Sequence, residues 1–268
     1  MQTSVSALPR LDQRDALVGQ LFGPRIMMNI ASLLNQAHIS NVLWGNSMID
    51  IYGVPTIDID MSFVVDRSQV HEATSLLSYA GLQQCMSEDC YPEAPPASHF
   101  HLPEVEQSMF PDLKPSVQFH IRDQLLGGLG LEFRNPTFTD EDNIIFASDG
   151  RLPKSDSLST SLGKGRHPTE SPVRILTPER YAEALVLLSL RDRDTDACIT
   201  WETQINYLSV YKLVNLKKVN SFCRDYLGSP LNVSQFERWD RAQEALNLIA
   251  NKGHRSQVPS QELTSTGI

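Results

Sequence analysis

Two acidic residues, Asp58 and Asp60, stand one residue apart at the start of an apolar segment that ends at Val65. On a β-strand, side chains at positions i and i+2 point to the same face, so both carboxylates would project together. Two adjacent carboxylates repel each other unless a cation lies between them. Carboxylate oxygens are ligands that Mg²⁺ prefers, and water and phosphate oxygens complete its shell. The spacing therefore predicts a magnesium site formed by this pair.

A turn precedes the acidic pair in the chain. The apolar residues 42–44 lead into Gly45, Asn46 and Ser47, and residues 47–52 then have the composition of a short helix. The start of a helix presents backbone N–H groups and the positive end of the helix dipole, which together attract anions. The segment therefore predicts an anion-binding turn beside the two aspartates.

This combination resembles the signature of the nucleotidyltransferase (polymerase-β-like) superfamily: a strand, a Gly-x-Ser turn, a short helix, and Asp-x-Asp on a second strand. The resemblance implies that Gly45, Asn46 and Ser47 bind a nucleoside triphosphate. It implies equally that Asp58 and Asp60 bind catalytic Mg²⁺. It also implies an α+β fold, in which a nucleotidyltransferase-like mixed sheet is flanked by helices and followed by a C-terminal helical bundle. More loosely, the chain resembles uncharacterised fungal proteins of this fold.

The third acid of that family is missing from the strand where the resemblance places it. Residues 116–122 (SVQFHIR) alternate between apolar and polar side chains, which predicts a strand beside the acidic one. Its polar face carries Ser116, Gln118, His120 and Arg122, and no acid. We expect Gln118 or His120 at the third-acid position, and we count His120 with the two aspartates as a candidate catalytic residue. The missing third acid leaves the reaction of this protein open, although the fold of the family is still expected.

A long proline-rich segment, residues 87–115, contains a short stretch at 98–102 (SHFHL) that reads as a strand. Long segments of this kind often form lids or pocket walls in compact domains. His99 and His101 would share one face of the strand, as metal ligands, as an acid/base pair, or as ordinary strand residues. With residues of neighbouring strands they define a candidate pocket, formed by Trp44, His99, His101, Gln118 and Arg122.

The chain has four cysteines, at positions 85, 90, 198 and 223. The N-terminus lacks a basic segment followed by an apolar one, so we expect no secretory signal and a cytoplasmic protein with reduced thiols. Cys85 and Cys90 are close enough in sequence to suggest a disulfide or a metal site. Because the sequence shows no second ligand pair at the usual zinc spacing, we interpret them as ordinary thiols.

The overall charge limits the classes of partner. A formal net charge of −9 at pH 7 argues against an extended nucleic-acid surface, which would need a basic face. No apolar run approaches the length of a membrane span. We therefore expect a small-molecule substrate and no membrane partner, with nucleic acid disfavoured, and the sequence leaves the oligomeric state open.

Composition and periodicity divide the chain into five parts. They are a flexible N-terminus (1–14), a nucleotidyltransferase-like α/β domain (15–153), a linker (154–171), a helical domain (172–250) and a disordered tail (251–268). The linker is rich in Ser, Gly and Thr, so we interpret its basic residues as solvated; they are Lys154, Lys164, Arg166 and His167.

Periodicity also predicts the individual elements. The expected strands are 39–44, 57–65, 82–85, 98–102 and 116–122, and residues 144–146 form a short apolar segment. The expected helices are a region at 12–37 broken at Gly23, then 47–52, 68–79, 178–191, 199–214, 219–227 and 234–250. We expect Ser68 and Thr177 to be N-caps and Pro24 to lie in the first turn of its helix.

Three functions are compatible with these patterns. The first is a magnesium-dependent nucleotidyltransferase that transfers a nucleotide to a small-molecule or protein acceptor. The second is an enzyme of fungal secondary metabolism that reuses the fold, as a cyclase or isomerase of an apolar metabolite, since a fold does not fix a reaction. The third is a non-catalytic binding protein of the same fold.

Overall fold

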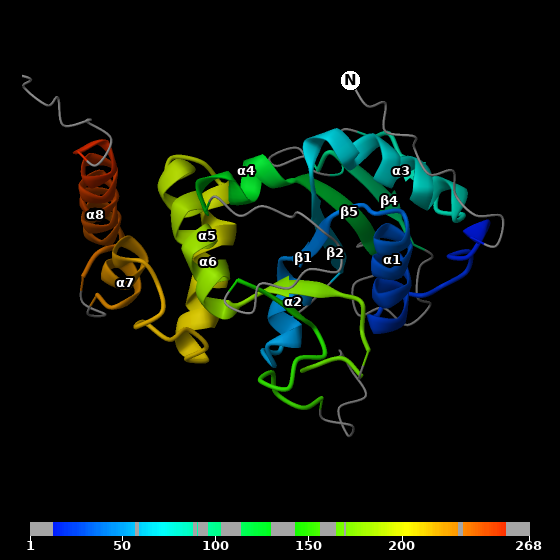
Figure 1. Ribbon diagram of the computed structural model, residues 1–268, viewed down its shortest axis with the longest axis horizontal. Helices are drawn as coiled ribbons and strands as arrows, with labels where there is room; N and C mark the ends of the chain where they lie inside the picture. Colours follow the sequence, from blue (N-terminus) through cyan, green and yellow to red (C-terminus); the bar gives the residue numbers. More distant parts are fainter. Residues whose placement is uncertain are drawn as a thin grey trace, which may run out of the picture. The chain divides into compact units, whose positions relative to one another are not determined.

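The computed structural model describes residues 13–56, 59–87, 90, 96–102, 114–129, 143–155, 165–168, 170–229 and 233–255, with backbone alone from 248 onward. Asp58 lies outside the described residues, as do residues 1–12 of the predicted flexible N-terminus (1–14) and residues 256–268 of the predicted disordered tail (251–268). The chain forms two compact units, Met1–Val214 and Asn215–Ile268. The first contains a seven-stranded mixed sheet flanked by helices, which confirms the predicted α+β class at this level (Figure 1).

The sheet has the strand order β3-β4-β5-β2-β1-β7-β6. The strands are β1 (Asn41–Trp44), β2 (Asp60–Val65), β3 (Gln84–Cys85), β4 (Ser98–His101), β5 (Ser116–Ile121), β6 (Ile144–Phe146) and β7 (Arg174–Leu176). β2 runs antiparallel to β1 and parallel to β5, while β7 is parallel to β1. β7 was not predicted, because three apolar-flanked residues are too few to show a period of two.

Helices α1 (Pro24–Gln36), α2 (Asn46–Ile51), α3 (Val70–Tyr79), α4 (Arg122–Leu126), α5 (Pro178–Arg191) and α6 (Ala197–Val210) belong to the first unit. α1 contacts α3, and α5 lies beside α6 (Figure 1). In the second unit, α7 (Ser221–Leu227) packs against α8 (Gln235–Arg255). None of the described helices combines the length and the apolar character that crossing a membrane requires.

Helix starts follow local backbone chemistry. Pro24 is the first residue of α1, and the Thr177 hydroxyl accepts a hydrogen bond from the Arg180 N–H, so both predictions are confirmed. Residues 13–22 form turns instead of the predicted helix, because Asp15 takes a positive φ of 57° that interrupts it. Ser68 is not an N-cap: it lies inside a short 3₁₀ turn, Arg67–Gln69, that precedes α3.

Two boundaries are placed differently from the expected ones. The predicted linker 154–171 lies within the first unit, where β6 and β7 on either side of it pair with each other. Helix α8 continues to Arg255, past residue 250, where the sequence predicted its end.

The sheet has two faces of different character along β2 and β5. One face is apolar and mostly buried, with Met61, Phe63, Val65, Val117 and Phe119 at 0% exposure and Ile121 half-buried. Successive residues of a strand point to opposite faces, and the alternate positions carry polar side chains except at Val64. The apolar face anchors the sheet in the core, so the opposite face is where chemistry can be placed.

A buried phenol joins α2 to the sheet and gives a test of this packing. Tyr52 is 2% exposed, and its hydroxyl donates a hydrogen bond of 2.7 Å to the Leu176 carbonyl oxygen of β7. Tyr52→Phe leaves that carbonyl without this donor, so we expect the free energy of unfolding to fall by about 1–2 kcal/mol in urea titrations. Tyr211→Phe, at a tyrosine that is 44% exposed, is the control. Equal stabilities of the two variants would contradict the assigned role.

Candidate functional site

The strand register brings most of the candidate residues to one face of the sheet. Residues paired directly across neighbouring strands share a face. One row of paired residues runs Cys85–His99–Gln118–Ser62–Trp44. The next row runs His101–Ser116–Asp60, and on the other side His120 pairs with Val64. Of the candidate set, Trp44, Asp60, His99, His101, Gln118 and His120 therefore occupy a single face.

A chain of hydrogen bonds crosses this face from His120 to Asp60. The Gln118 amide Nε2 donates to Ser116 Oγ at 3.1 Å, and the Ser116 hydroxyl donates to Asp60 Oδ1 at 2.7 Å. His120 Nε2 lies 3.2 Å from the amide oxygen of Gln118, which can only accept. Nε2 of His120 therefore carries the ring proton, and Nδ1 holds the lone pair.

Ser116 is a functional candidate that the sequence interpretation did not single out. It stands directly opposite Asp60 and is fully buried. Gln118 stands opposite Ser62, and His120 opposite Val64, so neither is the direct partner of the acid. The group that faces Asp60 across the strand pair is a hydroxyl. Knowledge of the strand register would have identified it.

His120 lines a cleft of about 750 Å³ formed by β5, α4, the end of α5 and the start of α6. Burial lowers the pKa of the His120 imidazole from 6.5 to about 4, so the ring is neutral at pH 7. Apolar surface in the cleft comes from Leu125, Ala197 and Trp201. At pH 7 the ring is able to accept a proton from a bound molecule, as a weak base because its pKa is about 4.

The charged residues of the cleft are mostly acidic. One arginine, Arg191, lines it together with Asp192, Asp194 and Asp196. Arg191 forms a two-bond ion pair with Asp192, through Nε and a terminal nitrogen, each at 2.6 Å. Burial acts to raise the pKa of Asp192, but hydrogen bonds from Arg191 and from the Trp201 indole hold it below its usual range. The cleft therefore favours neutral or cationic ligands over anions.

Trp44 lies behind this cleft within an aromatic cluster. Its ring meets Tyr181 of α5 edge-on, with centroids 4.7 Å apart, and Trp201 of α6 at 6.4 Å. Trp44 is 3% exposed, so it supports the cleft wall through Trp201. Arg122, another pocket candidate, forms an ion pair with Asp66 at 3.0 Å and is not among the residues that line the cleft.

The turn formed by residues 45–47 makes hydrogen bonds to neighbouring elements of the fold. Gly45 has φ of 79°, a conformation that favours glycine, and it precedes the first residue of α2, Asn46. The Ser47 hydroxyl is 1% exposed and donates to the Asp60 backbone carbonyl at 3.2 Å. A hydrogen bond from the Gly45 backbone also reaches the buried hydroxyl of Tyr181. The turn thus connects β1 to the acidic strand.

The two histidines of β4 lie beside two cysteines. His99 and His101 meet edge to face, with ring centroids 5.3 Å apart. Cys85 is paired with His99 across β3 and β4, and Cys90 Sγ lies 3.5 Å from His101 Nε2. Burial lowers the pKa of His99, as does His101, while the negative charge of Asp60 acts in the opposite direction. The sequence interpretation treated these two pairs separately and missed the cluster.

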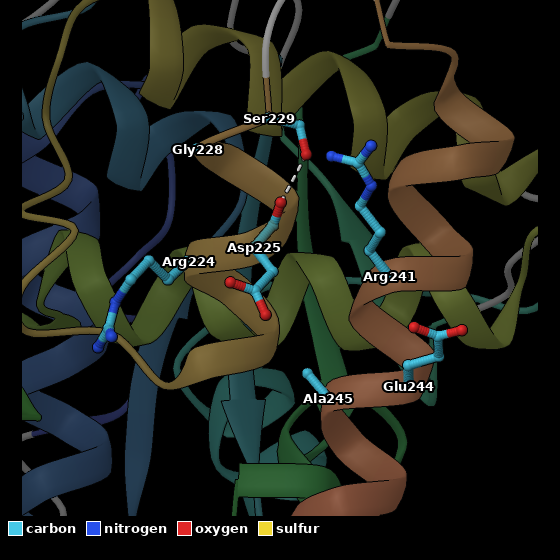
Figure 2. Close-up of a pocket in the computed structure, with 7 residues that line it drawn as sticks. All are labelled: Arg224, Asp225, Gly228, Ser229, Arg241, Glu244 and Ala245. Carbon is cyan, nitrogen blue, oxygen red and sulfur yellow. Dashed lines mark hydrogen bonds between the residues drawn. The ribbon is translucent and has the colours of Figure 1, made fainter.

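Two further hollows lie elsewhere. One, of about 500 Å³, includes the basic residues Lys154 and Arg166 of the predicted linker; Lys164 lies outside the described residues. The other, of about 470 Å³, lies between α7 and α8 in the second unit. Figure 2 shows Arg241 extending toward Ser229, whose hydroxyl donates to the Asp225 carbonyl oxygen. Its lining mixes acidic and basic surface side chains, and we assign no chemistry to it.

Comparisons with protein-family models, with curated proteins and with solved structures found no match to this chain.

The lowered pKa of His120 predicts how stability depends on pH. Its pKa is about 4 in the folded protein and 6.5 unperturbed, so below pH 6.5 the unfolded chain binds the proton more readily. Stability is fully present above pH 6.5 and is lost as the pH falls toward 4. We expect His120→Gln to reduce the loss between about pH 7 and pH 5 by about 1–2 kcal/mol in urea titrations.

His71→Gln, at an exposed histidine of α3, is the control for replacing a histidine outside the cleft. His167, whose pKa burial also lowers to about 4, gives an independent second test through His167→Gln. An unchanged pH dependence in His120→Gln would contradict the neutral ring.

Proposed function

We propose that this protein is a cytoplasmic enzyme that isomerises or cyclises a neutral or cationic, largely apolar metabolite, with His120 as general base. The observation that carries the proposal is the position of His120. Its ring lines the cleft and is held by the hydrogen-bond chain through Gln118 and Ser116 to Asp60. General base catalysis needs a neutral proton acceptor within reach of the substrate. A hydrogen-bond chain of this kind fixes the orientation of the acceptor ring.

The order of donors in the chain defines what each residue does. Because Nε2 of His120 donates toward Gln118, Nδ1 is the atom that takes a proton from the substrate. The imidazolium so formed is stabilised by dipoles that end at the Asp60 carboxylate. An amide does not pass protons on, so Gln118 and Ser116 orient the ring and do not conduct. In an isomerisation, Nδ1 returns the same proton to another atom, and no co-reactant is consumed.

The electrostatics of the cleft support a substrate without phosphates. Asp192, Asp194 and Asp196 outnumber Arg191, which is already paired. Triphosphates are usually bound by free cations and backbone N–H groups. The four cysteines are free thiols, in keeping with a reducing compartment such as the cytoplasm.

A second candidate is a nucleotidyltransferase-like protein that binds a nucleotide at residues 45–47. The hydrogen bond from Ser47 to the Asp60 carbonyl favours it, because it joins the predicted phosphate turn to the acidic strand. We propose on the same grounds that the sheet is nucleotidyltransferase-like and that α7 and α8 belong to its C-terminal bundle. The side chain opposite Asp60 is the Ser116 hydroxyl, a donor to the carboxylate, which does not fit a paired magnesium site. No transfer step is therefore assigned.

Ligand binding separates the candidates before a substrate is known. A panel of neutral and cationic apolar metabolites is screened by thermal shift, and hits are titrated by isothermal titration calorimetry. We expect Trp201→Leu to weaken binding at least about tenfold, because indole packing is lost. Trp239→Phe, on α8 in the second unit, is the matched control and should leave affinity unchanged.

Turnover of a hit then tests the base. We expect His120→Gln to keep binding but to lower kcat by about 10²–10⁴, the usual contribution of a general base. Stabilisation by Mg²⁺ with a nucleoside triphosphate at millimolar concentration, lost in Asp60→Asn, would overturn the proposal in favour of the second candidate. If hits bind but none is turned over, the protein would instead be a non-catalytic binding protein.

A further inference from the structure

Four potential metal ligands meet at the edge of the sheet formed by β3 and β4. They are the Sγ atoms of Cys85 and Cys90 and one ring nitrogen each of His99 and His101. All four ligand atoms lie within 4.8 Å of one another. His99 is buried and the other three are half-buried. Within the described part of the chain this is the one such cluster that contains thiols and imidazoles together.

Two of the distances between these ligand atoms match those of a tetrahedral zinc site. With Zn–S bonds of about 2.3 Å and Zn–N bonds of about 2.05 Å, two sulfurs lie about 3.8 Å apart and a sulfur and a nitrogen about 3.6 Å apart. Cys85 Sγ and Cys90 Sγ are 3.8 Å apart, and Cys90 Sγ is 3.5 Å from His101 Nε2. A disulfide would need sulfurs about 2.05 Å apart, so the two cysteines are not joined.

The local fold explains why these residues converge. His99 and His101 are two positions apart on β4, so they point to the same face. Cys85 is the direct partner of His99 across the strand pair, and Cys90 follows on the connection back to β4. The pattern is Cys-x₄-Cys, then His-x-His. The two cysteines have a spacing that is common among zinc ligands. The two histidines stand at positions i and i+2 of a strand, whereas the histidines of a zinc finger lie on a helix.

The chemistry of the cluster also favours a metal over hydrogen bonds alone. Thiols are weak donors and acceptors, so they compensate poorly for the burial of imidazole nitrogens. His101 Nδ1 is buried and has no hydrogen-bond partner among the described residues. Two thiolates and two imidazoles are a preferred ligand set for Zn²⁺.

We propose that Cys85, Cys90, His99 and His101 bind one Zn²⁺ ion in a closed structural site. Four protein ligands leave no open position, so the ion has a structural and not a catalytic role. β3 has only two residues and pairs with β4 alone, so this edge of the sheet has few hydrogen bonds. Zinc fixes Cys90 to the sheet. The site is independent of the reaction proposed above.

Metal content of the full-length chain tests the proposal. The untagged protein, purified under reducing conditions from zinc-supplemented cells, is dialysed against a weak chelator and analysed for all transition metals. We expect about one zinc per chain. Cys90→Ser and His101→Ala should each lower zinc affinity at least about 100-fold, more than the loss of an outer partner costs. Cys198→Ala in α6 and His71→Ala in α3 are the controls and should retain zinc.

A second measurement uses the wild-type protein, in case a ligand variant does not fold. Zinc should protect Cys85 and Cys90 from alkylation, measured by mass spectrometry, and removal of zinc with a strong chelator should expose both. Co²⁺ in its place should give the intense visible absorption of a tetrahedral thiolate site. Equal alkylation with and without zinc, retention of zinc by both ligand variants, or a Cys85–Cys90 disulfide in the purified protein would overturn the proposal.

Discussion

The parallel pairing of β2 with β5 is the constraint on which the site depends. Its register sets Asp60 opposite Ser116, Ser62 opposite Gln118 and Val64 opposite His120. A shift of one residue would turn every polar side chain of β5 into the core and bring Val117 and Phe119 out. The buried apolar face prevents such a shift. The shift would expose several large side chains to water, and each Å² of exposed apolar surface costs about 25 cal/mol. Packing on one face thus fixes the chemistry on the other.

The same register connects the two features proposed here. His99 stands between Cys85 and Gln118 in one row across the sheet. Gln118 in turn connects His120 to Ser116. A metal that holds His99 at the edge therefore also supports the strand that carries the hydrogen-bond chain. The metal cluster and the hydrogen-bond chain do not require each other. Both lie on the polar face of the sheet, opposite the apolar face that packs in the core.

The sequence predicts the elements of this protein better than their partners. Period-two alternation located β5, and a helix start signal located α5 with Thr177 as its cap. Alternation cannot specify which strand lies beside which, or in what register, so Ser116 was not recognised as the partner of Asp60. The cysteine and histidine pairs were each assessed by spacing alone. Their convergence depends on the pairing of Cys85 with His99, which is a tertiary fact.

The cleft illustrates why a family resemblance carries a fold further than a reaction. Its walls come from α4, which was not predicted, and from the turn after Arg191 that leads into α6. These segments lie outside the 25 or so residues on which the resemblance rests. They introduce three aspartates and an indole, whereas triphosphate binding calls for cations. The resemblance to a nucleotidyltransferase therefore stays a prediction, and it concerns the placement of polar groups on one face of the sheet. The charge that surrounds them decides what they can bind.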